Sequence, residues 1–429
     1  MASFPISVPE GCPFPIQNIP FGIFSEATHA ALRAGTAFGD WVLDLALVER
    51  QGLTFHSVRF ESANQGILLQ ETLNTFAALD KDIRRAVRRR IIELLSDGES
   101  WVYSDPALNK AAFYSRKVVI LHLPMSIPAF TDFSCFEEHV GNCFAISNIP
   151  FNSENNFYKS PMAYNGRASS VLSAGSSFAR PHGVYKDPTS GVVKYQPSQK
   201  LDYEMELGIL ISSPLPLGKV VDPDTAATDH IFGYVLLNDW SARDIQMYES
   251  MPAGPFNCKA FASHISPWVL MPEALEEART RPHNQNGDDV PVHIRHASLD
   301  RTSYDIQFDV HLARSSGKSA QVSRSNYKHS FFSPGQCVAH RASSGCGLQT
   351  GELLGGGTVS SPITSGSVAR NGCLMEVTWD GSREVPEIGG TYLDDGDEVT
   401  MEAWVQGPSG ITIGFGSLSV KVQPAREFL

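Results

Sequence analysis

The sequence predicts a mainly β protein of the α+β class, with a small N-terminal unit and a larger second one. The chain has 429 residues, more than one ordinary hydrophobic core accommodates. Short apolar stretches recur between turn residues, which favours a sandwich or barrel-like roll over alternating βαβ units. Pro124 and Pro128 mark a junction, so we place the two units at 1–123 and 124–429.

The N-terminal unit combines short strands with two helical patterns. Strands are expected at Phe21–Phe24 and Trp41–Leu45, and Val118–Leu123 fits a buried strand. Thr72–Asp80 and Lys81–Leu95 space their apolar residues three or four apart, which predicts helices. The predicted solvated face of the second helix carries Arg84, Arg85, Arg88, Arg89 and Arg90.

The second unit is expected to be mostly strands separated by turns. The predicted strands are Leu207–Ile211, Ile231–Leu237, Tyr304–Leu312 and Val399–Val405. Pro272–Val290 is polar and ends in turn residues, so an exposed excursion is expected there.

The composition excludes several classes of function. The net charge is −12, and an acidic chain without a Lys/Arg stripe lacks the electrostatic footprint for nucleic acid. No apolar run approaches the roughly 20 residues that span a bilayer, and the N-terminus does not resemble a signal peptide. The seven cysteines are scattered, so free thiols in a reducing compartment, and hence a cytoplasmic protein, are expected.

Two glutamates in Leu201–Leu207 form the first candidate site. Residues two apart in a strand face the same side, so Glu204 and Glu206 project together. Adjacent like charges repel, and a divalent cation that takes oxygen ligands, Mg²⁺ or Ca²⁺, removes the conflict. A solvent-facing pair would need no ion, and that interpretation stays open. Tyr203 and Met205 face the core in either case.

The run 238–246 is the second candidate. It follows the apolar stretch Tyr234–Leu237, so Asp239 lies at a strand end. That position suits a metal ligand and equally suits the N-cap of a helix. In such a helix Arg243 and Gln246, three apart, would share one face.

Four further residues have side chains suited to catalysis. Asp132 is expected in a loop before a helical turn, and His139 could reach the same cavity as a general base. Lys259 could stabilise an oxyanion. Glu376 alternates with apolar neighbours, which is typical of a half-exposed strand position. A structural histidine and an ordinary surface lysine are the competing interpretations.

Together these segments resemble the fumarylacetoacetase family over nearly the whole chain. The matching segments are Phe14–Asn18, Asp132 to His139, Tyr164–Ser170, 204–206, 238–246, Gly254–Lys259, Arg324–His329 and Leu393–Asp397. The run 238–246 is highly specific. The resemblance implies a small SH3-like N-terminal barrel, a large mixed β-sandwich roll and a homodimer.

The resemblance also implies a reaction and a set of residues. The reaction is metal-dependent hydrolysis of a C–C bond in a β-diketone, fumarylacetoacetate or a related dicarbonyl compound, in tyrosine and phenylalanine catabolism. The implied metal site comprises Asp132, Glu204, Glu206, Asp239, Lys259 and Ser263. The implied catalytic residues are His139, Glu376, Lys259, Arg243 and Gln246. The implied substrate-binding positions are Ser134, Tyr164, Arg243, Gln246, Ser250 and Thr358.

Three positions depart from the family pattern. Ser134, Asn148 and Ser250 stand where the family has Tyr, Arg and Tyr. An arginine that pairs with a substrate carboxylate is not replaced by asparagine. We therefore expect the same chemistry on a changed substrate. Two alternatives remain: a decarboxylase, tautomerase or C–C bond-forming lyase or isomerase in a specialised pathway, and a non-catalytic binding protein.

Overall fold

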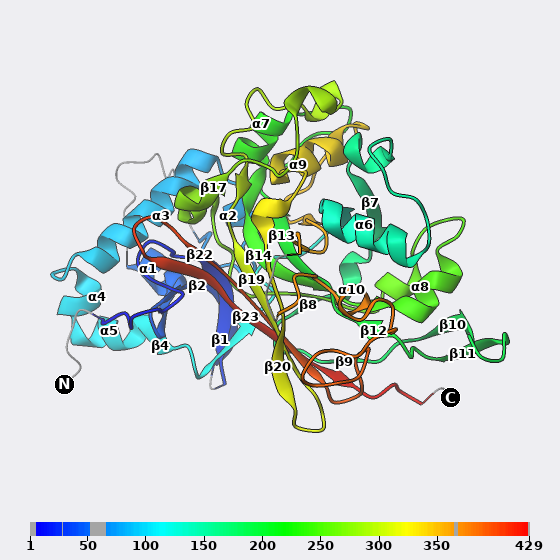
Figure 1. Ribbon diagram of the computed structural model, residues 1–429. Helices are drawn as coiled ribbons and strands as arrows, with labels where there is room; N and C mark the ends of the chain where they lie inside the picture. Colours follow the sequence, from blue (N-terminus) through cyan, green and yellow to red (C-terminus); the bar gives the residue numbers. More distant parts are fainter. Residues whose placement is uncertain (1–5, 28, 52–65, 364–367, 428–429) are drawn as a thin grey trace.

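The small N-terminal domain is built on a five-stranded antiparallel sheet (Figure 1). The computed structural model describes residues 6–27, 29–51, 66–363 and 368–427. The strand order is β4-β3-β2-β1-β5, with β1 (Phe21–Glu26), β2 (His29–Phe38), β3 (Trp41–Asp44), β4 (Phe113–Ser115) and β5 (Val119–His122). Between β3 and β4 come α1 (Leu45–Arg50), α2 (Asn74–Ala77), α3 (Lys81–Ser96), α4 (Trp101–Ser104) and α5 (Pro106–Ala112).

A seven-stranded sheet forms the centre of the larger domain. Its order is β7-β6-β21-β13-β14-β16-β8, and only β6 with β21 and β8 with β16 pair in parallel. The strands are β6 (Phe130–Ser134), β7 (Met162–Gly166), β8 (Val171–Ser173), β13 (Met205–Ile211), β14 (Ile231–Asp239), β16 (Ser263–Ile265) and β21 (Leu353–Gly355).

A second five-stranded sheet, of order β20-β19-β22-β23-β9, packs near this centre. It contains β9 (Phe178–Ala179), β19 (Gln307–Ala313), β20 (Ser319–Asn326), β22 (Glu398–Gln406) and β23 (Thr412–Gln423). Three strand pairs complete the sheets: β10 (His182–Lys186) with β11 (Val193–Pro197), β12 (Leu201–Asp202) with β15 (Ser241–Ala242), and β17 (Arg279–Thr280) with β18 (Ser303–Tyr304). The helices are α6 (Glu137–Ile146), α7 (Pro223–Thr225), α8 (Arg243–Glu249), α9 (Pro334–Ala342) and α10 (Leu374–Thr378).

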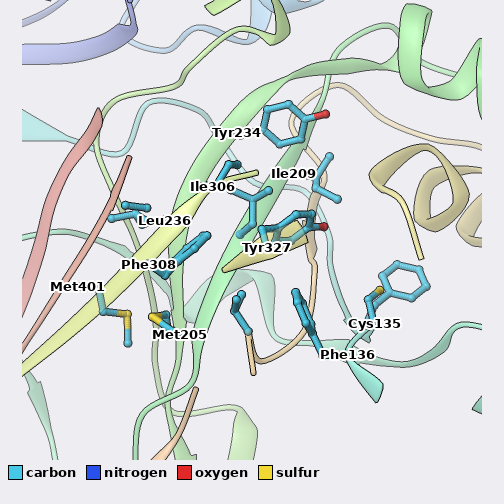
Figure 2. Packing of buried hydrophobic residues seen from close by; sticks show 14 of the residues in the cluster. Cys135, Phe136, Met205, Ile209, Tyr234, Leu236, Ile306, Phe308, Tyr327 and Met401 are labelled. Atoms are coloured by element: carbon cyan, nitrogen blue, oxygen red, sulfur yellow. The ribbon is translucent and has the colours of Figure 1, made fainter. Parts of the chain in front are cut away.

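The central sheet is buried on both faces by two separate cores. One face contributes Met205, Ile209 and Leu236 to the main core, where they pack with Phe308 and Met401 of the second sheet (Figure 2). The other face packs on the N-terminal domain. We call that cluster the junction core, and its central-sheet members include Phe130, Leu210, Val235, Leu237, Ile265 and Leu353. Every residue of β13 and β14 is accordingly buried.

The structure confirms a mainly β, α+β protein with a small N-terminal domain. The expected strands at 207–211, 231–237 and 399–405 lie within β13, β14 and β22, and the helix expected at Lys81–Leu95 is α3. Residues 304–312 are divided between β18 and β19, and the first N-terminal helical pattern shrinks to the single turn of α2. All seven cysteines are free, as predicted. Among the described residues, no helix has the length and apolarity needed to cross a membrane.

Three expectations about exposure are corrected. The stretch Val118–Leu123 is an edge strand, with Ile120 49% exposed, because β5 pairs only with β1. Arg84 is not on a solvated face: it is buried and donates to two backbone oxygens. Pro272–Val290 is exposed at Asp288 and Asp289. Its first half, however, packs Leu275 into the main core, so it is not a free excursion.

Candidate active site

One face of the central sheet changes from apolar to acidic along five neighbouring strands. The apolar half lies in the junction core and includes Phe130, Leu353, Leu210, Leu237 and Ile265. Because side chains two apart in a strand share a face, the same face continues into a polar half. In strand order that half carries Asp132, Gly355, Glu206 with Glu204, Asp239 and Ser263.

Three acidic side chains from this half meet at one point. Carboxylate oxygens of Asp132, Glu204 and Asp239 all lie within 4.8 Å of one another, and all three residues are buried. Glu206 lies beside them and accepts a hydrogen bond from the backbone N–H of Gly357, at 2.9 Å. The structure therefore brings together the four acidic residues that the sequence predicts, although Asp132 lies in β6 rather than in a loop.

Burial and mutual repulsion raise the pKa values of Asp132 and Glu206. Burial, then the charges of Glu206 and Asp239, raise the pKa of Asp132 well above its usual value. Burial, then Glu204 and Asp239, raise the pKa of Glu206 to about 8. When two carboxylates lie close together, ionising the second costs free energy, and its pKa rises unless a cation shares the site.

A single lysine partly offsets this negative charge. Lys259 is 5% exposed and donates to Glu204 and, at 2.6 Å, to Asp239. Burial lowers the pKa of Lys259, but the Asp239 and Glu204 carboxylates outweigh burial and raise it above its ordinary value. Asp239 also accepts from Ser263 Oγ at 2.9 Å and from the Tyr164 hydroxyl at 2.5 Å.

The donor set fits a hard divalent cation. Asp132 Oδ1 is buried without a hydrogen-bond partner among the described residues, and a buried orphan oxygen needs such an explanation. Gly355 makes room for the cluster, since a Cβ there would lie 2.0 Å from Asp132 Oδ1 and 2.7 Å from Glu206 Oε2. Four carboxylates against two cationic side chains, Lys259 and Arg243, with no thiol or imidazole among the ligands, suit Mg²⁺ or Ca²⁺.

Arg243 links this cluster to the neighbouring strands. Its guanidinium donates to Glu204 at 2.8 Å, to Gln246 at 3.0 Å and to Asp202 at 2.9 Å. Arg243 and Gln246 do share a face of α8 as expected, but that helix has no side-chain cap, so the N-cap interpretation of Asp239 is wrong. Glu204 is thus held from both sides, by Lys259 and by Arg243.

Asp202 is a buried residue that the sequence interpretation missed. Besides Arg243, it accepts hydrogen bonds from the backbone N–H groups of Leu374, at 2.7 Å, and Met375, at 3.0 Å. It therefore anchors α10, the helix that carries Glu376. Its signal was present in the sequence, because Asp202 lies two residues before Glu204 and continues the same acidic alternation.

His139 and Glu376 form a buried pair beside the carboxylates. His139 Nδ1 and Glu376 Oε2 are 2.8 Å apart. Glu376 is completely buried in α10, so the expectation of a half-exposed strand position is wrong. Its carboxylate is also hydrogen-bonded by Asn142 at 2.8 Å and Ser360 at 2.8 Å. Burial raises the pKa of Glu376, but His139 and these donors outweigh burial and lower it to about 2.

A thiol completes the surroundings of the imidazole. Cys143 lies one turn after His139 in α6, and its Sγ is 3.6 Å from His139 Nε2. Burial lowers the pKa of His139. Cys143 and then Glu376 raise it by more than burial lowers it, so the net pKa lies well above its usual value. Cys143 is half-buried, and no feature of the sequence had marked it.

The remaining expected substrate positions are more scattered. Ser134 ends β6 two residues after Asp132, and Thr358 is buried directly after the Gly355–Gly357 run. Ser250 ends α8, and its hydroxyl is buried without a partner among the described residues. Asn148 is exposed and follows Ser147, the C-cap of α6, in the left-handed conformation, at φ 56°. Asparagine suits that turn, so this residue is explained by chain geometry.

Two family models match the chain. The model described as "Fumarylacetoacetase N-terminal" matches residues 17–124, and "Fumarylacetoacetate (FAA) hydrolase C-terminal" matches residues 129–423. A fumarylacetoacetase of Caenorhabditis elegans is 37% identical and covers 99% of this chain and 100% of its own. The fumarylacetoacetase of Arabidopsis thaliana is 36% identical, with 96% of each chain covered.

A solved structure shares the fold at much lower sequence identity. The crystal structure of Cg1458 with inhibitor superimposes with a TM-score of 0.52 at 14% identity, covering 95% of this chain and 100% of the other. At that identity the likeness supports the fold alone.

Proposed function

This chain belongs to the fumarylacetoacetate hydrolase family, and from that membership we propose that it hydrolyses a C–C bond in a β-diketone. The proposed substrate is fumarylacetoacetate, split by water into fumarate and acetoacetate, or a related small dicarbonyl compound. The observation that carries the proposal is the His139–Glu376 pair, 2.8 Å apart, beside a converging cluster of carboxylates.

His139 is the proposed general base. A base that removes a proton from water must be neutral at one ring nitrogen and oriented at the other. Because the pKa of His139 is raised, its neutral form, and hence the reaction, is favoured at alkaline pH. Glu376 fixes His139 Nδ1, as the acidic member does in hydrolytic triads. Nε2, which has the Cys143 thiol 3.6 Å away, is the proposed acceptor of the proton as water attacks the carbonyl carbon. The half-buried Asn142 and the buried Ser360 donate to Glu376 and hold it in place.

Two groups are suited to the negative charge that develops on the attacked carbonyl oxygen. We assign that role to Lys259 and Gln246, because preorganised donors in a buried site stabilise an oxyanion strongly. Arg243 already donates to Asp202, Gln246 and Glu204. Its proposed role is therefore to hold Gln246 and Glu204 in place and to add a fixed positive charge.

We propose that Asp132, Glu204, Glu206 and Asp239 hold Mg²⁺ or Ca²⁺, with Lys259 and Ser263 beside it. When bound, such an ion would polarise the dicarbonyl and stabilise the enolate that departs. Tyr164 and Ser263 orient Asp239 by hydrogen bonds at 2.5 and 2.9 Å. These hydrogen bonds support the proposed role of Asp239 as a ligand.

The wider setting is proposed from family membership. We infer a domain division at 1–123 and 124–429, a cytoplasmic homodimer, and a place in tyrosine and phenylalanine catabolism. The proposed substrate contacts are Ser134, Tyr164, Gln246, Ser250 and Thr358, and Arg243 acts on the substrate by holding Gln246.

A second function is favoured by the changed substrate positions. Asn148 faces solvent and serves a turn, so it offers no counterpart to an arginine that grips a carboxylate. A family member repurposed as a decarboxylase, tautomerase or C–C bond-forming enzyme fits that loss. Turnover in ¹⁸O-labelled water separates the two, because only hydrolysis must place solvent oxygen in the new carboxylate.

The test of the proposed base is His139→Ala. Losing a general base should lower kcat by roughly 100- to 10,000-fold, while calorimetric titration with Mg²⁺ or Ca²⁺ gives an unchanged affinity. His311→Ala, at an exposed position on β19, should retain full activity. Unchanged turnover of His139→Ala would remove this residue from the mechanism.

A further inference from the structure

A second cavity, of about 480 Å³, opens between the segment after β17 and the end of β20. It shares no residue with the proposed active site. Its lining comprises Thr280, Arg281, Pro282, His283, Asn284, Gln285, Asn286, Lys328 and His329. These residues include two permanent cations, two imidazoles and three side-chain amides, and no acid.

One lining side chain has an unmet need for a partner. His329 Nδ1 is buried and makes no hydrogen bond within the described residues. The rings of His329 and His283 meet edge to face, with centroids 5.1 Å apart. Buried polar atoms in folded proteins are nearly always partnered, so an orphan ring nitrogen on a residue that lines a cavity points to a ligand or an ordered water.

The surroundings of His329 are electropositive. Burial, then the charges of His283, Lys328 and Arg370, lower its pKa to about 4. Two acids lie against the lining: Asp305, whose carboxylate is 3.4 Å from Lys328 at the surface, and Glu137, which accepts from Asn284. The chain as a whole carries a net charge of −12, so this accumulation of cationic groups is a local exception. An anion in the cavity would relieve the repulsion between them.

We propose that this cavity binds a small oxyanion of the phosphate type through Arg281, Lys328 and His329. The guanidinium and ammonium donate charge-assisted hydrogen bonds, which are about twice as strong as neutral ones. His329 supplies a further ring N–H. The exposed amide of Asn284 adds a neutral donor at the rim. The proposal stands on this cavity alone and does not depend on the reaction proposed above.

The cavity is linked to the active site by one hydrogen bond. Asn284 Nδ2 donates to Glu137 Oε2 at 3.2 Å, and Glu137 lies in the first turn of α6, two residues before His139. A bound oxyanion would therefore contact the same loop that touches the helix of the proposed base.

The probe is inorganic phosphate, titrated into the full-length protein at constant ionic strength with sodium chloride. The readout is the histidine ring C–H resonances, with the His329 signal assigned by His329→Gln. We expect a saturable shift of the His329 and His283 signals. Arg281→Gln and Lys328→Gln should each weaken the apparent affinity by about tenfold, the effect of losing one charge-assisted contact of about 1.4 kcal/mol.

The matched control is Lys318→Gln, which removes the same charge from an exposed position in the β19–β20 turn. It should leave phosphate affinity unchanged. The proposal is overturned if phosphate shifts the His329 signal no more than chloride does. It is also overturned if Lys318→Gln weakens binding as much as Lys328→Gln, because the effect would then be nonspecific.

Discussion

Glu204 is the carboxylate that connects the acidic cluster to both cationic side chains of the proposed site. It touches Lys259 and Arg243 and lies within 4.8 Å of Asp132 and Asp239. Glu204→Gln keeps the shape but removes one anionic ligand, so Mg²⁺ and Ca²⁺ affinity should fall by at least the roughly 10- to 100-fold lost on removing a partner of a ligand. Calorimetric titration measures the effect. Unaltered affinity would exclude Glu204 as a ligand.

Asp187→Asn is the control for that measurement. This aspartate pairs with Lys194 in the β10–β11 hairpin, which projects from the body of the molecule (Figure 1). The same loss of one negative charge there should leave metal affinity unchanged, which separates ligation from a general change in net charge.

Cys143 offers a test of how the imidazole is tuned. A general base works only in its neutral form, so the acid limb of the pH–rate profile follows the pKa of His139. Cys143 raises that pKa, so Cys143→Ala should move the acid limb to lower pH. The exposed Cys346 provides the control variant Cys346→Ala, which should leave the profile in place. If the acid limb of Cys143→Ala is unchanged or shifts to higher pH, Cys143 does not raise the pKa of His139.

Single residues differed in how far the sequence could place them. Glu204 and Glu206 were predictable, because strand alternation alone puts both on one face. Glu376 was assigned to the wrong element, since a five-residue helix is too short to show a helical period. Asp202 and Cys143 were missed. Asp202 continues the acidic alternation of Glu204 and Glu206, but its bonds to Arg243 and to α10 appear only in the folded chain. Cys143 lies only four residues after His139, and their contact depends on the helix α6 that contains both.

Among the elements, α3 depends on one buried guanidinium. Arg84 Nη1 donates to the carbonyls of Ala77, at 2.7 Å, and Leu79, at 2.5 Å, at the end of α2. Burial lowers the pKa of Arg84 to about 10, so its charge is costly, but truncation would leave both carbonyls unpaired. Arg84→Ala should therefore lower the free energy of unfolding by about 2 kcal/mol.

The matched control on the same helix is Arg89→Ala. Arg89 is exposed, and such a surface change usually stays within about 0.5 kcal/mol. Urea denaturation of the two variants measures the difference. Equal effects would show that the buried contacts of Arg84 contribute nothing to stability.

The elements also show the limits of pattern-based prediction. The long apolar runs of β13 and β14 were recognisable, since strands buried on both faces read as continuous hydrophobic stretches. The exposure of β5 was not, because an edge position is decided by which strand pairs with which. Pairing between distant segments, such as β6 with β21, leaves no mark in the local sequence.

At the scale of the whole molecule, the junction core should make the two domains unfold together. Phe76 of α2 lies 4.9 Å from Phe21 in its own domain and 5.8 Å from Phe232 of β14, centroid to centroid. We expect a single calorimetric transition. Phe76→Ala, which costs about 3–5 kcal/mol in a packed core, should shift that whole transition to lower temperature. Two resolved transitions, with only one displaced, would contradict this coupling.

The alternation on the central sheet limits how this chain can change in length. Asp132, Glu206 and Asp239 share a face with the apolar residues that dock the N-terminal domain. One inserted residue between Val235 and Asp239 would turn the aspartate into the main core, because side chains alternate. Two inserted residues would restore the direction of the Asp239 side chain but would displace it along the strand, away from Asp132 and Glu206. Insertions and deletions should therefore be tolerated in outlying hairpins such as β10–β11. Within the strands of the central sheet they should abolish activity.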